Sequence, residues 1–361
     1  MKPLEKIVFI ISNISIGGAQ RVTLTLCRWF IKRGFNVKII AVSTSSGNYV
    51  IPDNIEVEFL YHSSNLKVFH TIGRLKKYLQ KERPQLVITM GVAPCLFSVP
   101  AVKSVKGIKH IISERNDPRH FLGKGIVKQL SRLMMKSGDG FVFQTEDAKI
   151  YYSKALSGRG IVIPNPILAE NIPDAIHTEK KNYIVTMGRL TKQKNHNLLI
   201  NAFDLFANSH PEYELHIYGS GELEEETKKF AKTKKTKYTI IFFAACNDVL
   251  ERIKDAKIFV LSSDFEGMPN ALIEAMAMGL PCISTDCPCG GPKFLIKNEK
   301  NGLLVPVGDV KSMTEAMNRL ARSQVYRDQI GQEASKIRSR LSVEQISEMW
   351  IEYCEEIFND K

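Results

Sequence analysis

The stretch SSDFEGMPNALIEAMAMGLPCIST, residues 262–285, decides how the rest of this chain is interpreted. It follows a buried apolar segment, turns through Gly267, and continues as a segment over 270–279 that is typical of a helix. Glu266 lies in the turn and Glu274 lies one turn into the helix, so both carboxylates can face one ligand. A helix N-terminus offers backbone N–H groups to a phosphate, and carboxylates accept hydrogen bonds from vicinal sugar hydroxyls. The stretch therefore predicts a site for a phosphorylated sugar.

A pair of carboxylates is also typical of glycoside hydrolases. A hydrolase has little use for phosphate-binding loops, however, and a second such loop follows an earlier strand. In GRLTKQKN (188–195), Arg189 supplies a guanidinium fork and Lys194 a point charge, which together suit a diphosphate. An ordinary exposed basic turn could have the same sequence. The phosphate-binding interpretation of this loop therefore depends on the stretch at 262–285.

Short apolar strands alternate with helical segments on both sides of that stretch, which predicts a parallel α/β architecture. The polar segment 169–182 shows no apolar period and predicts a linker, after which the pattern restarts. We therefore expect two doubly wound α/β domains, 1–168 and 183–342, with a C-terminal helix at about 343–361 packing back on the first. Ligands of such sheets bind beyond the carboxyl ends of the strands. In the first domain we expect strands at 7–11, 35–42, 57–60, 86–91, 110–114, 140–145 and 160–166.

Length and composition agree with two globular domains. The chain has 361 residues, 44% of them hydrophobic and 24% charged, which excludes collagen-like, disordered and disulfide-scaffold classes. No apolar run approaches the roughly 20 residues of a membrane span, and residues 1–12 read as a buried strand rather than a signal peptide. The seven cysteines are scattered without a CxxC pattern, so neither a disulfide framework nor a zinc site is predicted. We expect a cytoplasmic protein.

The charge is concentrated in the first half of the chain. The formal net charge is +12, and residues 1–170 hold 25 Lys and Arg against 11 Asp and Glu. Such an excess favours an acidic partner. Four basic residues recur at helical spacing, either as a surface for an anionic membrane or as a solvated helix face: Lys124, Lys128, Arg132 and Lys136. A second basic stretch, 66–84, is more typical of an ordinary surface helix. No aromatic residues interleave with these runs, which argues against a nucleic-acid partner.

Taken together, the motifs resemble the family-4 retaining glycosyltransferases, whose GT-B fold places two doubly wound α/β domains around a central cleft. The resemblance covers nearly the whole chain and is most specific over residues 262–306. DCPCGGPKFLI (286–296) is similar to a loop of members that build bacterial surface polysaccharides and lipid-linked oligosaccharides. The remaining motifs that carry the resemblance are Gly17-Gly18, GRL…K (188–194), IPNP (163–166), GSGE (219–222) and NGLLVP (301–306).

The resemblance implies a role for each matching position. Arg189 and Lys194 hold the donor diphosphate and stabilise the departing nucleotide, Glu266 contacts the transferred sugar, and Glu274 binds the ribose hydroxyls. It implies no metal and no cofactor. The donor also meets two backbone loops, made of Gly17 and Gly18 in the first domain and of Gly267, Met268, Pro269 and Asn270 in the second.

In the first domain, many members of the family carry a His after the strand expected at 110–114. This chain has Glu114 and Arg115 in that region, and we assign them to the acceptor or membrane side of the site. His120 lies six residues further along, and the sequence does not place it.

The resemblance implies retaining, metal-independent transfer of a hexose or N-acetylhexosamine. The donor is a nucleotide sugar, most often UDP-linked, and the acceptor a polyprenyl-diphosphate-linked glycan at the inner face of the cytoplasmic membrane. One alternative is a transferase of the same fold with a soluble acceptor. Another is a noncatalytic protein that binds a nucleotide sugar or a nucleic acid, against which the four intact residues Arg189, Lys194, Glu266 and Glu274 argue.

Overall fold

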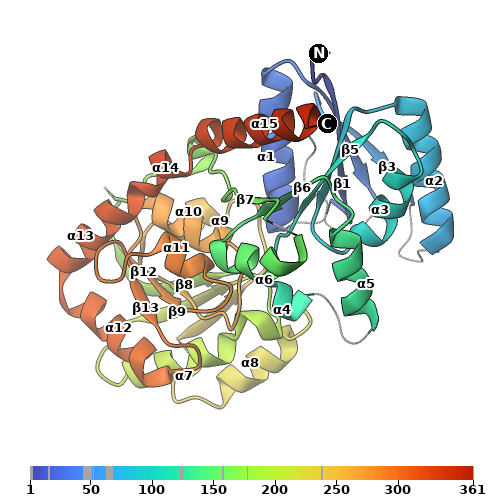
Figure 1. Cartoon of the computed structure of the whole chain (residues 1–361). Coiled ribbons are helices and arrows are strands. Elements are labelled where there is room, and N and C mark those ends of the chain that lie inside the picture. Colours follow the sequence, from blue (N-terminus) through green and yellow to red (C-terminus); the bar gives the residue numbers. More distant parts are fainter. Residues whose placement is uncertain are drawn as a thin grey trace. The chain divides into compact units, whose positions relative to one another are not determined.

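The chain folds into two compact units (Figure 1). The first unit comprises Met1–Pro166 and Val343–Lys361, and the second comprises Ile167–Ser342. Each unit is built on one parallel β-sheet. The computed structural model describes residues 3–14, 17–43, 51, 53–61, 68–121, 126–156, 158–176, 178–236 and 239–360.

The first unit holds a seven-stranded sheet in the order β3-β2-β1-β4-β5-β6-β7. The chain runs outward from β1 to β3 and then returns to the other side of β1 at β4, so the strand order reverses between β1 and β4. Ligands of doubly wound sheets bind beside such a reversal. The strands are β1 (Lys6–Ile11), β2 (Asn36–Ala41), β3 (Glu56–Phe59), β4 (Leu86–Met90), β5 (Lys109–Ser113), β6 (Gly140–Phe143) and β7 (Gly160–Val162).

Both faces of this sheet are covered because its strands are apolar on both sides. On one face, Phe9 of β1 meets Phe30 of α1 edge to face at 5.8 Å, and the Tyr353 hydroxyl of α15 accepts from the Phe141 amide at 2.9 Å. On the other face, Val8 and Ile10 share a core with residues of α2 and α3. The helices of this unit are α1 (Gly18–Lys32), α2 (Val68–Glu82), α3 (Cys95–Lys103), α4 (Pro118–Phe121), α5 (Ile126–Met135), α6 (Glu146–Leu156) and α15 (Val343–Asn359).

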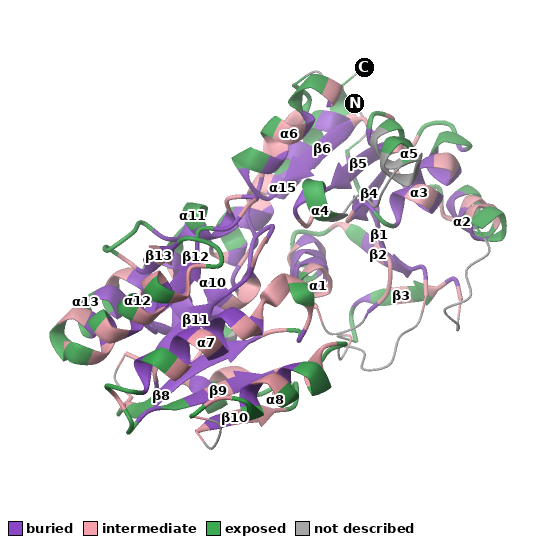
Figure 2. Ribbon diagram, turned by 90° about the horizontal axis from the view of Figure 1, so that it is seen from below, coloured by how far each residue is buried: buried purple, intermediate pink, exposed green. Residues whose placement is uncertain are grey.

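The second unit repeats the plan with a six-stranded sheet in the order β10-β9-β8-β11-β12-β13. Here the order reverses between β8 and β11, which pair directly. The central strands of both sheets are buried (Figure 2). The strands are β8 (Lys181–Met187), β9 (Glu214–Tyr218), β10 (Ile240–Phe243), β11 (Ala256–Leu261), β12 (Cys282–Thr285) and β13 (Leu303–Val305).

The helix α10 (Asn270–Met278) is the most deeply placed helix of this unit, with every residue from Leu272 to Met278 buried. Apart from Asn270 and Glu274 its sequence is apolar, as expected for a helix enclosed by neighbours. The other helices are α7 (His196–Phe206), α8 (Glu224–Lys232), α9 (Val249–Ile253), α11 (Gly291–Leu295), α12 (Val310–Arg322), α13 (Gln324–Ser335) and α14 (Ile337–Arg340), with short 3-10 turns at Ala169–Asn171 and Lys192–Lys194.

The described residues of the polar segment 169–182, which the sequence predicts as a linker, belong to the second unit. The Arg338 guanidinium donates to the carbonyls of Ile172 and Pro173 at 3.2 and 2.9 Å, and the Ala175 amide donates to the Met278 carbonyl at 2.9 Å. Its last residues begin β8. No helix in the described ranges is both long enough and apolar enough to cross a bilayer.

Candidate active site

Four loops meet at the carboxyl end of the second sheet, and glycines let them approach closely. A Cβ atom added to Gly219, which follows β9, would lie 1.8 Å from the Gly188 carbonyl oxygen of the loop after β8. A Cβ added to Gly291, at the start of α11, would lie 1.8 Å from the carbonyl oxygen of Gly267 in the loop after β11. Since no Cβ fits at these distances, the GSG and GGP motifs hold the two predicted donor loops in place.

Lys194 and Glu266 meet at this edge of the sheet. The Lys194 ammonium and the Glu266 carboxylate lie 2.5 Å apart, and both side chains are largely buried. Lys194 follows β8 and Glu266 follows β11, so the pair lies at the point where the strand order reverses. A buried ion pair between two loops fixes their spacing and places one cation and one anion where a ligand of this fold binds.

Two further side chains hold the Glu266 carboxylate. The fully buried Ser263 hydroxyl donates to Glu266 Oε1 at 2.6 Å, and Gln193 Nε2 donates to Glu266 Oε2 at 3.3 Å. Beside them, Asn195 Nδ2 donates to Asp264 Oδ1 at 2.7 Å and ties the same two loops together. The carboxylate is therefore oriented by three donors, of which Lys194 is one.

The remaining donor-site predictions lie on the same edge. Gly267, Met268 and Pro269 form the buried turn that enters α10, and Asn270 is its first residue. Glu274 lies one turn into α10 and is buried. Arg189 lies in the loop of Lys194 but is exposed, so the structure brings Lys194 and Glu266 into contact and leaves Arg189 at the surface of the loop.

In the first unit, Gly17 and Gly18 lie where β1 leads into α1. Gly17 caps the helix in an extended conformation, with φ −172° and ψ 164°, and Gly18 is its first residue. They follow the strand beside which the order of this sheet reverses. In doubly wound sheets, loops at this position bind ligands.

The predicted basic stripe falls on α5 only in part. Lys128 and Arg132 lie within α5, and Lys136 is exposed one residue beyond its end. Lys124 lies outside the described residues. The helix itself begins at Ile126.

Glu114 is buried, with 1% of its surface exposed, in a network at the end of β5. Its carboxylate accepts from the amides of Arg115 and Asn116 at 2.9 and 3.1 Å and from the Tyr152 hydroxyl at 3.1 Å. Burial raises the pKa of this carboxyl to about 7. The Arg115 guanidinium turns to Asn165 of the IPNP motif at 2.5 Å. The buried carboxylate thus fixes the loop after β5, and the acceptor-side role of Glu114 and Arg115 stays a prediction.

One pair in this unit escaped the sequence analysis. The fully buried Asp117 accepts from His120 Nδ1 at 2.9 Å, and the His120 ring is half exposed. The Asp117 carboxylate also accepts from the Arg119 amide at 2.9 Å, so it is fixed in place. A carboxylate that accepts from Nδ1 fixes the orientation of the imidazole and the tautomer that it adopts. The three-residue spacing of Asp117 and His120 in DPRH was the sequence feature that could have indicated this pair.

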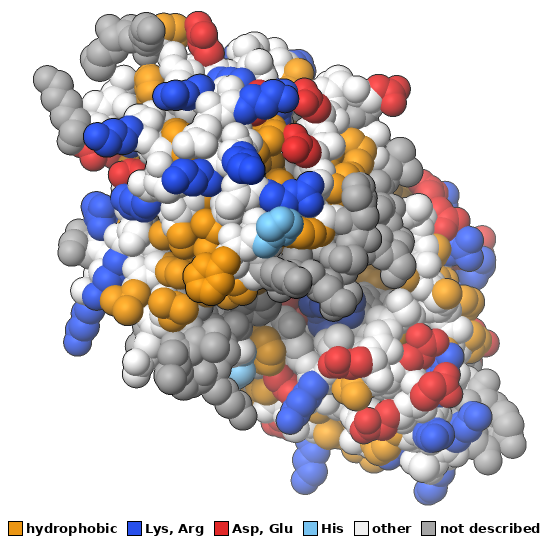
Figure 3. Space-filling view, turned by 90° about the vertical axis from the view of Figure 1, so that its right-hand side faces the viewer, with side chains coloured by type: hydrophobic (Ala, Val, Ile, Leu, Met, Phe, Trp, Pro, Cys, Tyr) orange, Lys and Arg blue, Asp and Glu red, His pale blue; other side chains and the backbone are white. Residues whose placement is uncertain are grey.

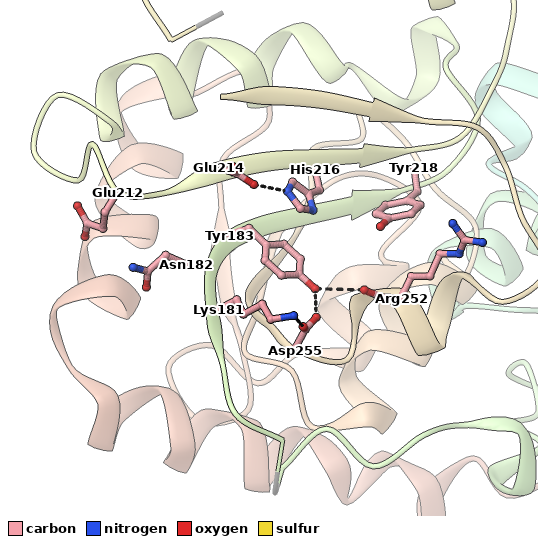
Figure 4. Close-up of a pocket in the computed structure, with 9 residues that line it drawn as sticks. All are labelled: Lys181, Asn182, Tyr183, Glu212, Glu214, His216, Tyr218, Arg252 and Asp255. Atoms are coloured by element: carbon pink, nitrogen blue, oxygen red, sulfur yellow. Dashed lines mark hydrogen bonds and ion pairs between the residues drawn. The ribbon is translucent and has the colours of Figure 1, made fainter. Parts of the chain in front are cut away.

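A separate hollow of about 360 Å³ lies on the second sheet, with Tyr183 stacked on His216 at 4.2 Å (Figure 4). Two pairs lie within its wall: Lys181 with Asp255 at 2.6 Å, and Glu214 with the His216 ring at 2.7 Å. Its lining residues come from β8, from β9 and the turn before it, and from the segment of Arg252 and Asp255 before β11, and none belongs to the loops of Lys194 and Glu266. Across the described residues, no three His, Cys, Asp or Glu side chains are grouped as metal ligands would be.

Two family models match the chain. Glycosyltransferase Family 4 matches residues 16–170, and Glycosyl transferases group 1 matches residues 169–337. An uncharacterized glycosyltransferase of Haemophilus influenzae is 28% identical over 96% of this chain and 99% of its own length. A Campylobacter jejuni alpha-1,4-N-acetyl-D-galactosaminyltransferase, named for a glycan on PP-undecaprenol, is 25% identical over 99% and 100%.

A further relative and two solved structures are also glycosyltransferases or resemble this chain in fold. An Escherichia coli UDP-Gal:alpha-D-GlcNAc-diphosphoundecaprenol alpha-1,3-galactosyltransferase is 26% identical over 86% of each chain. Among solved structures, a mutant of Staphylococcus aureus TarM in complex with UDP superposes with a TM-score of 0.82, at 14% identity over 99% of this chain and all of the other. Anabaena HepE in complex with UDP and glucose gives 0.83, at 14% identity over 96% and 98%.

Proposed function

Since the chain belongs to the GT-B glycosyltransferases, with a family 4 domain followed by a group 1 domain, we propose that it moves a hexose or N-acetylhexosamine from a UDP-sugar to a glycan carried on a polyprenyl diphosphate. The contact between Lys194 and Glu266 at the strand reversal is the observation that supports this most. It puts a cation for the diphosphate and a carboxylate for sugar hydroxyls side by side.

The donor site works by electrostatics in this proposal. When the bond between the sugar C1 and the phosphate oxygen breaks, negative charge develops on the leaving diphosphate, and Lys194 and Arg189 neutralise it. Lys194 is paired with Glu266 in the free protein, so the diphosphate must share or replace the carboxylate as its partner. Ser263 and Gln193 continue to orient Glu266 when that happens.

We propose that transfer retains the anomeric configuration. The acceptor hydroxyl attacks C1 on the face from which the diphosphate leaves, the new C1–O bond forms there, and the hydroxyl proton passes to a phosphate oxygen. No protein nucleophile is required for this course. Because fixed cations supply the charge neutralisation, we propose that no divalent metal and no cofactor are needed either.

The acceptor is proposed from two observations. Relatives of matching length are named for undecaprenol-diphosphate-linked glycans, and the first half of this chain carries the whole positive excess that would suit a lipid diphosphate at an anionic membrane. We further propose that the protein works peripherally at the cytoplasmic face of the membrane, with no nucleic-acid partner.

Donor binding tests the site. In a thermal-shift panel of nucleotide sugars, we expect UDP-sugars to raise the melting temperature of the wild type, since a ligand that binds the native state stabilises it. Lys194→Ala should weaken that binding by about tenfold or more, because a charge-assisted contact is worth about 1.5–3 kcal/mol. Lys181→Ala is the control, since it removes a lysine from an ion pair of the same unit that lies outside the donor loops. Equal binding by both variants would contradict the assigned role of Lys194.

A further inference from the structure

Lysine and arginine side chains are common on the surface of this protein, and Figure 3 shows many of them on one face. A positive charge by itself therefore does not distinguish Lys194. Its ammonium is distinctive because it is held 2.5 Å from the Glu266 carboxylate, with only 15% of the lysine side chain exposed. A lysine ammonium is carried on a flexible four-carbon stem. Its position therefore depends on how firmly the backbone at the start of that stem is fixed.

Asn195 follows Lys194 and adopts a left-handed backbone conformation, with φ 42° and ψ 56°. Few residues other than glycine take this conformation, and asparagine is one of those that do. Its side chain has two partners. Oδ1 accepts from the Leu198 amide at 3.1 Å and caps α7, and Nδ2 donates to Asp264 Oδ1 at 2.7 Å. A single amide group thus joins the start of α7 to the loop after β11, and we call its bond to Asp264 the loop clasp.

The two residues that precede the clasp are tied to the same loop. The Asp264 amide donates to the Gln193 carbonyl at 2.9 Å, and the Ser262 hydroxyl donates to the Lys194 carbonyl at 2.9 Å. The loop that carries Lys194 and the loop that carries Glu266 are therefore held together at consecutive residues. Of these ties, the loop clasp alone joins two side chains.

The carboxylate of Asp264 has one use in this arrangement. In the ranges that the structure describes, it takes part in no ion pair, and the hydrogen bond that it accepts comes from Asn195. A carboxylate makes a stronger acceptor than a neutral oxygen does. The loop clasp is thus a charge-assisted bond, and its two residues come from loops that follow different strands.

We propose that Asn195 and Asp264 are positioning residues of the donor site. Through the loop clasp they hold the backbone of Lys194 where its ammonium reaches both Glu266 and the donor diphosphate. The inference rests on the proposed function for the diphosphate, but not for the contact with Glu266, which the free protein already makes. Both residues act through Lys194, so the consequences of losing the clasp should pass through that lysine.

The test exchanges the two side chains. Asn195→Asp sets two carboxylates against each other and breaks the clasp, while aspartate still tolerates the left-handed conformation and still caps α7. The double variant Asn195→Asp with Asp264→Asn restores the bond with donor and acceptor reversed. We expect Asn195→Asp to weaken UDP binding about tenfold in a direct titration, the loss typical of a hydrogen bond to a charged group. The exchanged double variant should recover the wild-type affinity.

A second comparison asks whether the effect passes through Lys194. In a Lys194→Ala background, Asn195→Asp should weaken UDP binding no further, because residues that act together are not additive. The matched control is Asn301→Asp, which makes the same change of charge at an amide that accepts from the Lys297 amide at 2.6 Å and donates to the Leu295 carbonyl at 3.2 Å. It should bind UDP as wild type does. Additive losses, or an exchanged double variant that is folded but does not recover, would overturn the inference.

Amine labelling of the free protein gives a readout that needs no nucleotide. After brief treatment with acetic anhydride, peptide mass spectrometry reports the acetylation of each lysine, with the exposed Lys192 as the internal reference. Lys194 should react slowly in wild type, about tenfold faster in Asn195→Asp, and slowly again in the exchanged double variant.

The two readouts separate the inference from the proposed function. If wild type fails to bind UDP while the labelling of Lys194 follows the clasp, the proposed function fails and the positioning of Lys194 stands. If the labelling is equal in all of these proteins, the inference is overturned whatever the nucleotide result.

Discussion

At the scale of single residues, the site depends on side chains whose partners are distant in sequence. Glu266 is held by Ser263 from its own loop and by Gln193 and Lys194 from a loop more than 70 residues earlier. Each donor removes rotational freedom from the carboxylate before a ligand arrives, which is how a site is preorganised for charge that develops later. Glu114 is buried and held as firmly, and the hydrogen bonds that it accepts fix the loop after β5.

Glu114 gives the stability of the first unit a pH dependence. Burial raises the pKa of its carboxyl from 4.5 to about 7, so the unfolded state releases this proton first as pH rises. The free energy of unfolding should therefore fall between about pH 4.5 and 7, by about 3 kcal/mol at most, and then level off. Glu114→Gln does not titrate and should lack this fall.

Melting temperatures at pH 5 and pH 8 check this for wild type, Glu114→Gln and the exposed control Glu352→Gln. We expect the difference between wild type and Glu114→Gln to change with pH, in the direction that makes wild type relatively weaker at pH 8. The control should follow wild type. Parallel curves for wild type and Glu114→Gln would contradict the assigned burial of an ionisable carboxyl.

At the scale of elements, the loops after β8, β9, β11 and β12 form one edge because glycines let their backbones touch. The succession of strands along the chain and their approximate bounds could be predicted, since apolar runs between glycine turns mark buried strands. For example, β5 was expected at 110–114 and spans Lys109–Ser113. The contacts between the loops could not be predicted, because the periodicity of a sequence does not show which loop backbones approach one another. Gly291 illustrates this, since only its 1.8 Å approach to Gly267 shows why a side chain is excluded.

Gly291→Ala should therefore disturb the turn that enters α10. Its new Cβ would also lie 3.0 Å from Pro269 Cδ, so the turn must move, and overpacking of this kind costs about 1–3 kcal/mol. We expect the affinity for UDP to fall about tenfold or more in a direct titration. Gly73→Ala, in α2, is the control: no atom lies within 4 Å of its added Cβ, and it should bind UDP as wild type and gain about 0.5–1 kcal/mol of stability. Unchanged UDP binding by Gly291→Ala would refute the contact.

At the scale of the whole molecule, the chain completes its first unit last. α15 returns from the end of the second unit and buries Trp350 in the first, while its Tyr353 hydroxyl accepts from the Phe141 amide. Each unit has its own strand reversal, with Gly17 and Gly18 after β1 in one and Lys194 and Glu266 after β8 and β11 in the other. The family motifs predicted which residues belong to each loop. They could not predict the burial of Glu114 or the bond between Asn195 and Asp264, because both depend on packing by distant elements.

The measurement that tests the central claim most directly is the initial rate of sugar transfer from a UDP-sugar to a synthetic polyprenyl-diphosphate-linked acceptor, with EDTA present, for wild type and Glu266→Gln. Glutamine keeps the size of the side chain but removes its charge, so the fold should persist, as the melting temperature would verify. We predict full wild-type activity in EDTA, a product of retained anomeric configuration, and a rate about 10²–10³ lower for Glu266→Gln, the usual loss when a group that stabilises the transition state is removed. A wild type that is active only with added Mg²⁺ or Mn²⁺, or a Glu266→Gln variant as fast as wild type, would contradict the account.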